Sequence, residues 1–336
     1  MRLVLVSLQI KLCKLQTMED EEDLLPEMAD LSKIEEGLYL GNITAALDTE
    51  TLKKYRISHI LTVDSKPLPT NITYIPGMNF LYIEVDDMEN EDLLAHFEEA
   101  NAFIEDGQLK GNVLVHCFFG VSRSTTLVIS YLMKKHKLTL DEAFQRVKSK
   151  RRCVGPNSGF LKQLLVYQNM QWNVIEDNIQ YRLYRLAGAA FSLRSAFSVT
   201  KEGTVQFRDK FQDLVQPDPR ISSSESDLVA LRCKICRSAL VRKGSLLPHC
   251  PGESPGWCDG KWSGRFQNFS LCAEGIYTLP IAWMGDITSQ LQGKLGCPKC
   301  QAKIGSYSWV SGHQCPCGAN IKPAFHFIPS KVDRCL

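Results

Sequence analysis

The sequence has 336 residues, a formal net charge of +2, 44% hydrophobic residues and 23% charged residues. This length exceeds that of a usual single domain and allows a sizeable hydrophobic core, so we expect two domains. The nearly balanced charge gives no indication of a nucleic-acid or membrane-surface partner, and no apolar run reaches the roughly 18 residues of a membrane-spanning helix.

The N-terminal segment combines a short apolar run with an acidic stretch. Residues 3–8 follow Arg2 as in a secretory signal, but the run is short and has no clear small-residue cleavage site. Met18 opens an acidic stretch over residues 19–23. We therefore expect residues 1–30 to form a disordered acidic tail, with Met18 as an alternative start, rather than a signal peptide.

Segments with strand and helix patterns alternate along the first half of the chain. The helix from residue 139 opens with the capping-box pattern Thr-Leu-Asp-Glu. This alternation predicts an α/β domain with a largely parallel central sheet that ends near residue 175. The expected strands cover residues 34–41, 57–63, 80–85 and 113–115, and the expected helices cover residues 48–55, 93–104, 124–135, 139–150 and 158–172.

The segment between the strand over residues 113–115 and the next helix has the composition of an anion-binding loop. Its backbone N–H groups lie at a helix N-terminus, where they can converge on a phosphate or sulfate. These groups favour the thiolate form of Cys117, which is a nucleophile. The predicted phosphate-binding residues are Phe118, Phe119, Gly120, Val121, Ser122 and Arg123.

Three residues of this segment have defined chemical roles. Arg123 offers a planar fork to two phosphate oxygens, and Gly120 permits a close approach of the backbone to the anion. Ser124 can donate a hydrogen bond to the Cys117 sulfur when that sulfur leaves. A buried core cysteine is the ordinary alternative for Cys117 alone, but this combination of residues predicts a catalytic site.

The pattern His-Cys-x-x-Gly-x-x-Arg-Ser at residues 116–124 resembles the signature of the cysteine-dependent protein tyrosine phosphatases. Residues 36–42 and 130–133 are similar to the dual-specificity branch of that family. The resemblance implies a three-layer phosphatase domain over residues 31–175 and hydrolysis of phosphotyrosine and phosphoserine/threonine without a catalytic cofactor. Phe119 stands where that branch often has a small residue, and we expect its ring to narrow or line the mouth of the site.

Phosphate ester hydrolysis also needs a proton donor for the departing oxygen, and an acidic loop follows the strand over residues 80–85. Its carboxylates are Asp86, Asp87, Glu89, Glu91 and Asp92. In the dual-specificity family the acid usually closes an apolar-x-apolar-x-Asp strand. Matching Ile-Glu-Val-Asp-Asp at residues 83–87 to that pattern selects Asp87, with Asp86 as the alternative. Asn157, ahead of the last helix, either braces the anion-binding loop at residues 118–123 (the phosphate loop) or caps that helix.

The remaining chain divides into a connecting region and a cysteine-rich end. We expect residues 176–228 to form a helical arm and a linker rich in Pro and Ser. Ten of the 13 cysteines follow residue 230. Such clustering indicates disulfides in a secreted domain or zinc in an intracellular one, and a thiolate enzyme needs the reducing compartment that favours zinc. We therefore expect residues 229–336 to form a small, mainly β domain stabilised by two structural zinc ions.

The cysteine spacing suggests how the two ions are held. Two C-x2-C knuckles and one C-x-C pair supply closely spaced thiolates, and structural zinc sites use four protein ligands. Cys250 and Cys258 compete for the last positions of the second set. The first expected set is Cys297, Cys300, Cys315 and Cys317, and the second is Cys233, Cys236, His249 and Cys272.

A phosphatase domain followed by such a zinc domain resembles one subgroup, dual-specificity protein phosphatase 12 and its fungal relatives, over roughly residues 30–330. The most specific C-terminal elements are Cys-Pro-Lys-Cys, Lys-Ile-Gly-Ser-Tyr-Ser-Trp and Cys-Pro-Cys-Gly. The resemblance implies phosphoprotein substrates, a role of the zinc domain in late maturation of the large ribosomal subunit, and a location in cytoplasm and nucleus. Pre-ribosomal particles are then expected partners, whereas a membrane or sequence-specific DNA is not.

Two other functions stay open on the sequence alone. In one, the zinc domain acts as a ribosome assembly factor and phosphatase activity is secondary. In the other, the substrate is a non-protein phosphate such as a phosphoinositide or an RNA 5′-phosphate. The loop residues Phe118, Phe119 and Val121 provide none of the lysines that would favour an acidic lipid.

Overall fold

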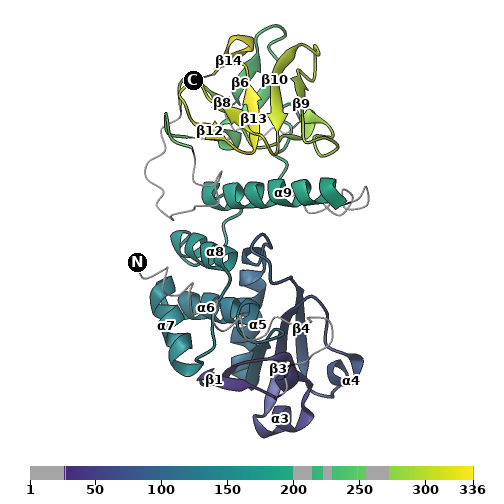
Figure 1. Cartoon of the computed structure of the whole chain (residues 1–336), viewed down its shortest axis with the longest axis vertical. Coiled ribbons are helices and arrows are strands. Elements are labelled where there is room, and N and C mark those ends of the chain that lie inside the picture. Colours follow the sequence, from purple (N-terminus) through teal and green to yellow (C-terminus); the bar gives the residue numbers. More distant parts are fainter. Residues whose placement is uncertain are drawn as a thin grey trace. The chain divides into compact units, whose positions relative to one another are not determined.

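The computed structural model describes residues 26, 28–199, 214–221, 229–247, 249–254 and 272–335. The chain forms two compact units, residues 1–175 and 176–336 (Figure 1). Most of the expected acidic tail lies outside the described residues. Within the described part, no helix combines the length and apolar character needed to cross a membrane.

A five-stranded sheet forms the centre of the first unit. Its strand order is β1-β2-β5-β3-β4, and every neighbouring pair is parallel except β1 and β2. The single strand expected over residues 34–41 is instead a hairpin, because Gly37 turns the chain with a φ of +72°. The strands are β1 Leu31–Glu35, β2 Leu38–Gly41, β3 Ile57–Asp64, β4 Asn79–Glu84 and β5 Asn112–His116.

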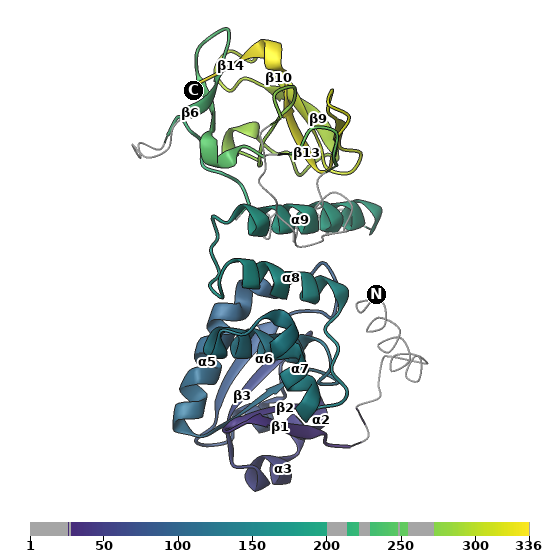
Figure 2. The same cartoon turned by 90° about the vertical axis from the view of Figure 1, so that its left-hand side faces the viewer.

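Helices cover both faces of this sheet, which gives the predicted three-layer phosphatase-like fold. Ile60 and Leu114 pack with residues of the three short helices α2 Ile43–Leu47, α3 Thr49–Lys54 and α4 Thr70–Thr73. On the other face α5 lies close to Val113, and Figure 2 shows α5 and α6 across the sheet. The longer helices are α5 Phe97–Lys110, α6 Arg123–His136, α7 Leu140–Lys150 and α8 Ser158–Asn169, and a 3-10 turn, η1 Leu94–His96, precedes α5.

The predicted capping box is confirmed at the start of α7. The Thr139 side chain accepts a hydrogen bond from the Glu142 backbone, and the Glu142 carboxylate accepts one from the Thr139 backbone. Because both bonds satisfy N–H groups that the helix leaves unpaired, α7 begins at a fixed residue. Its other end leads directly to Arg151, which reaches the predicted phosphate loop.

The second unit combines one long helix, α9 Ile179–Val199, with short antiparallel strands. One sheet has the order β8-β13-β10-β9, another has the order β14-β6-β7, and β11 pairs with β12. The strands are β6 Val229–Cys233, β7 Ala239–Arg242, β8 Ile276–Tyr277, β9 Gln292–Gly296, β10 Lys303–Ser308, β11 His313–Gln314, β12 Asn320–Ile321, β13 Ala324–Phe327 and β14 Val332–Arg334. Single 3-10 turns are η2 Lys243–Ser245, η3 Ala282–Met284 and η4 Pro329–Lys331.

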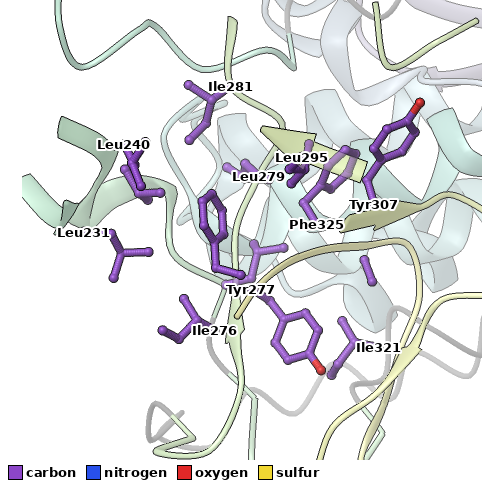
Figure 3. Packing of buried hydrophobic residues seen from close by; sticks show 14 of the residues in the cluster. Leu231, Leu240, Ile276, Tyr277, Leu279, Ile281, Leu295, Tyr307, Ile321 and Phe325 are labelled. Atoms are coloured by element: carbon purple, nitrogen blue, oxygen red, sulfur yellow. The ribbon is translucent and has the colours of Figure 1, made fainter. Parts of the chain in front are cut away.

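Buried side chains from both sheets form one hydrophobic core in the second unit. Figure 3 shows Leu231 and Leu240 of the smaller sheet on one side of this core and Leu295 and Phe325 of the larger sheet on the other. Three leucines of α9 belong to the same core: Leu183, Leu186 and Leu193. The helix that the sequence placed in a connecting arm is therefore part of the packed second unit.

Candidate active site and metal centres

Cys117 lies at the end of β5, in the loop that leads into α6. The strand and the first three turns of the helix are buried, which fixes both ends of the loop. The Cys117 sulfur accepts hydrogen bonds from the Gly120 backbone N–H at 3.3 Å and from the Ser124 hydroxyl at 3.1 Å. Hydrogen-bond donors directed at the sulfur can stabilise negative charge that develops or departs there, so the position suits a nucleophile.

Gly120 is required by the way this loop packs against β2. Its φ is +70°, and a Cβ atom built on it would lie 2.4 Å from the carbonyl oxygen of Gly41. The Ile43 backbone N–H also donates to the Phe118 carbonyl at 3.1 Å. Gly41 belongs to the segment at residues 36–42 that resembles the dual-specificity branch, and Ile43 follows it directly. The end of this segment therefore supports the loop from outside.

The outward carbonyls of the loop are held by residues that follow α7. Arg151, which is buried, donates to the carbonyls of Gly120 at 3.0 Å and Phe119 at 3.2 Å. The Gly155 N–H donates to the Val121 carbonyl at 2.9 Å. In a trans peptide the C=O and N–H groups point in opposite directions, so the N–H groups of residues 120–122 point to the inner side, where an anion would lie.

Asp87 lies against the phosphate loop, whereas Asp86 is directed elsewhere. Asp87 accepts hydrogen bonds from the Ser122 hydroxyl at 2.7 Å and from the Asn157 amide at 2.8 Å. Asp86 accepts one from the Ser65 hydroxyl at 2.6 Å. Of the two candidates for the general acid, only Asp87 contacts the loop that would hold the phosphoryl group.

Asn157 carries out both of the roles considered for it. Its side-chain oxygen accepts a hydrogen bond from the Phe160 backbone at 2.9 Å, which caps α8. Its amide donates to Asp87, and its backbone N–H donates to the Ser122 hydroxyl at 3.1 Å. The start of α8 therefore connects the acidic loop to the phosphate loop.

His116, directly before Cys117, is a neutral structural residue. Its Nε2 lies 2.8 Å from the Thr62 hydroxyl, and its Nδ1 lies 3.4 Å from the Cys117 carbonyl. Burial lowers the pKa of His116 to about 4. A neutral ring with its proton on Nδ1 donates to the Cys117 carbonyl and accepts from Thr62, which holds the backbone in place at Cys117.

Arg123 and the phosphate loop are held by two residues, Asp64 and Arg151, that the motif at residues 116–124 does not identify. Arg123 Nη1 donates to Asp64 at 2.8 Å and to the Val85 carbonyl at 3.2 Å. Asp64 closes β3, and Arg151 follows α7. Each is a single charged residue at the end of an element, and no spacing rule relates it to the motif at residues 116–124.

The eight predicted metal ligands are all present in two groups, but their predicted pairing is wrong. In each group the four ligand atoms lie within 4.8 Å of one another. Of the two competitors, Cys250 is in neither group, and Cys258 lies outside the described residues. The first group is Cys233, Cys236, Cys297 and Cys300, and the second is His249, Cys272, Cys315 and Cys317.

The length of β10 explains this correction. The knuckle at residues 297–300 is the turn before β10, and Cys315 and Cys317 follow after its far end. A six-residue strand spans about 20 Å, so neighbours in sequence are separated in space. The knuckle at residues 233–236, which is the turn between β6 and β7, meets the turn between β9 and β10 instead.

The spacing of the ligand atoms fits a tetrahedral zinc site. A Zn–S bond of about 2.3 Å places two thiolates of a tetrahedron about 3.8 Å apart. The distance between the sulfurs is 3.7 Å for Cys233 and Cys300 and 3.8 Å for Cys272 and Cys315. Cys317 Sγ lies 3.4 Å from His249 Nε2. Four protein ligands in each group leave no open position, so both groups suit structural ions.

Comparisons with known proteins match the first unit to a family and extend over most of the chain. Residues 38–170 match the family described as "Dual specificity phosphatase, catalytic domain". Dual specificity protein phosphatase MPK-4 of Drosophila melanogaster is 35% identical, over 93% of this chain and 89% of its own length. Dual specificity protein phosphatase 12 of Rattus norvegicus is 33% identical, over 90% and 87%. Tyrosine-protein phosphatase YVH1 of Saccharomyces cerevisiae is 29% identical, over 91% and 92%.

Proposed function

Since the chain belongs to the dual-specificity protein phosphatases, in the group of dual specificity protein phosphatase 12, we propose that it hydrolyses phosphotyrosine and phosphoserine/threonine in proteins. The reaction proceeds through a phosphocysteine intermediate formed at Cys117. The observation that carries this proposal is the geometry at the Cys117 sulfur. In the peptide group between Phe119 and Gly120, the carbonyl accepts a hydrogen bond from Arg151 and the N–H donates one to that sulfur. Sulfur and main-chain donors thus face the same space, which suits a phosphoryl group.

The first step transfers the phosphoryl group to the enzyme. The Cys117 thiolate forms a bond to phosphorus while the bond between phosphorus and the substrate oxygen breaks. Asp87 gives its proton to the departing oxygen. Arg123 and the inward N–H groups of residues 120–122 stabilise the charge on the transferred group.

The second step releases phosphate and restores the enzyme. Asp87, now a carboxylate, accepts a proton from water, whose oxygen forms a bond to phosphorus as the S–P bond breaks. The Ser124 hydroxyl, 3.1 Å from the Cys117 sulfur, stabilises the departing thiolate. These steps need only the residues of the first unit, and we assign no catalytic cofactor.

The proposal is tested by trapping the intermediate. Rapid quenching with a 32P-labelled phosphopeptide should leave label on the wild-type protein and none on Cys117→Ser, which should also lose aryl phosphate turnover. Cys153→Ser, at an exposed cysteine of the same unit, is the matched control and should keep both properties. Turnover by Cys117→Ser at the wild-type rate would refute the mechanism.

For the second unit we propose two structural zinc ions and a docking role, with pre-ribosomal particles as the partner and the cytoplasm and nucleus as the location. The closed ligand groups support a structural role, and reduced thiols fit such compartments. The alternative, in which this unit is the main activity, is separated by complementation of a deletion strain. Rescue by Cys117→Ser but not by Cys297→Ser would favour assembly, and the reverse would favour catalysis.

A further inference from the structure

The contacts of Arg123 are restricted to one end of its guanidinium group. Nη1 donates one proton to Asp64 Oδ1 at 2.8 Å and the other to the Val85 carbonyl at 3.2 Å. The Arg123 side chain is only 8% exposed. Its buried Nε nevertheless has no hydrogen-bond partner in the described structure.

The unpaired Nε identifies the edge of the guanidinium that is available to a ligand. Bidentate recognition of a phosphate uses two parallel N–H groups on one side of the fork. With Nη1 occupied, the side formed by Nε and Nη2 remains for this purpose. An unpaired buried donor is unfavourable, and a bound phosphoryl oxygen would satisfy it.

Asp64 is itself fixed in place. It is the last residue of β3, which lies beside β5 in the sheet, so both strands end at the edge that carries the phosphate loop. The Ser65 backbone N–H donates to Asp64 Oδ1 at 2.8 Å, and the residue is 6% exposed. The oxygen that accepts from Arg123 is therefore held by the backbone and shielded from solvent.

We propose that Asp64 is a positioning residue of the phosphatase reaction, which anchors Arg123 by Nη1 so that Nε and Nη2 face the transferred phosphoryl group. This inference rests on the proposed role of Arg123. A positioning role differs from a purely structural ion pair in its consequence. Loss of Asp64 should weaken phosphoryl binding by leaving Arg123 badly oriented, and not by lowering the stability of the fold.

The first test measures aryl phosphate kinetics and inhibition by inorganic orthovanadate. Asp64→Ala should lower kcat/KM and orthovanadate affinity by about 10- to 100-fold, since a hydrogen bond to a charged group is lost. Asp64→Asn keeps the accepting oxygen and the shape, and its amide nitrogen takes the place of Oδ2, which has no partner. Its loss should be about fivefold, because a neutral acceptor holds Arg123 less firmly.

The matched control removes an acid elsewhere on the same unit. Asp106 lies on α5, is half exposed and pairs with Lys110. Asp106→Ala should change kcat/KM by less than about twofold. Thermal unfolding of each variant shows whether it is folded. If Asp64→Ala does not fold, the kinetics and orthovanadate affinity of Asp64→Asn test the proposal. Unchanged or tighter orthovanadate binding by Asp64→Asn would overturn the proposal.

A double-mutant cycle separates positioning from stability. Lysine has no second edge to orient, so Asp64→Ala should cost several-fold less in an Arg123→Lys background than in the wild type. Equal costs in both backgrounds would overturn the proposal. Full turnover by Cys117→Ser would overturn the proposed function and this inference together. Loss of turnover by Cys117→Ser, with Asp64→Ala unchanged, would overturn only the role of Asp64.

Discussion

The two units use cysteine sulfur in opposite ways. In the first unit the Cys117 sulfur is surrounded by hydrogen-bond donors, from Gly120 and Ser124. In the second unit sulfurs face other sulfurs, as Cys236 faces Cys297 at 3.5 Å. Donors favour a lone thiolate that can attack an electrophile, whereas converging thiolates repel one another unless a cation joins them. The surroundings of the sulfur, and not the residue type, thus determine its chemistry.

The comparison also predicts how each site should fail. The phosphate loop is built from main-chain groups that several side chains hold in place, so the loss of one support should weaken it by a limited factor. Each metal group depends on four side chains alone. Burial raises the pKa of the Cys297 and Cys315 thiols, so these thiols keep their protons until an ion binds and displaces them. Loss of one ligand should therefore abolish the site.

The largest effect is expected from Cys297→Ser. A structural zinc ion contributes on the order of 10 kcal/mol to folding, so the second unit should lose its cooperative thermal unfolding and one of its two zinc ions. Cys335→Ser, at a cysteine outside both groups, should keep two ions. Metal analysis and circular dichroism measure these outcomes, and aryl phosphate turnover shows that the first unit is still folded.

The same measurement tests the revised pairing. Cys233→Ser combined with Cys297→Ser should lose no more zinc than either single variant, because both residues belong to one group. Cys297→Ser combined with Cys315→Ser should lose both ions. The opposite pattern would restore the pairing that adjacent sequence positions suggested.

The contrast explains what the sequence could predict. Cys117, Gly120 and Arg123 lie within seven consecutive residues, so a local motif determines their geometry once the flanking strand and helix are in place. The ligand residues were recognisable from their knuckles, but their pairing depends on where β10 carries the chain. A metal group joins residues up to 68 positions apart, and no local pattern encodes that distance.

The supports of the phosphate loop were missed for a related reason. Asp64 contacts Arg123 from 59 positions away, and Arg151 contacts Gly120 from 31 positions away. In the sequence each is an ordinary charged residue after a strand or a helix. Only the sheet order, with β3 beside β5, and the direction of α7 show that they meet the loop.

The second largest effect is expected from Asp87→Asn. Loss of the general acid should lower kcat by about 10²- to 10⁴-fold for a substrate with a poor leaving group, and by less for an acidic phenol, which needs no proton. Asp86→Asn is the matched control, since Asp86 contacts Ser65 rather than the phosphate loop. Steady-state kinetics with two aryl phosphates of different leaving-group acidity measure the difference. A larger loss from Asp86→Asn would reverse the assignment.

The pH dependence of stability should reveal the buried His116 in the first unit. Its pKa is about 4 in the folded protein and about 6.5 in the unfolded chain, so the unfolded state binds more protons between these values. The contribution of His116 to the free energy of unfolding should be fully present well above pH 6.5. It should decrease as the pH falls, with a loss of about 2 kcal/mol at pH 5.

Urea unfolding of the wild type and His116→Gln at pH 7.5 and pH 5 isolates this contribution, because the two proteins share the same metal groups. The variant is expected to be less stable at pH 7.5 but to lose less on acidification. If both proteins lost the same free energy between the two pH values, His116 would not be the group that titrates.

The smallest effect is expected from Arg151→Ala, and it tests whether main-chain geometry limits catalysis. Removing the donors to the Phe119 and Gly120 carbonyls should let the peptide groups turn. Because these bonds hold the backbone from outside and do not touch the transferred group, only part of their free energy should appear in catalysis, as a loss of about tenfold in kcat/KM. Arg152→Ala, at the exposed neighbour, should leave kcat/KM unchanged. If Arg151→Ala were folded and fully active, the loop would keep its inward N–H groups without this support, and Gly120 and β2 would have to be sufficient to hold it.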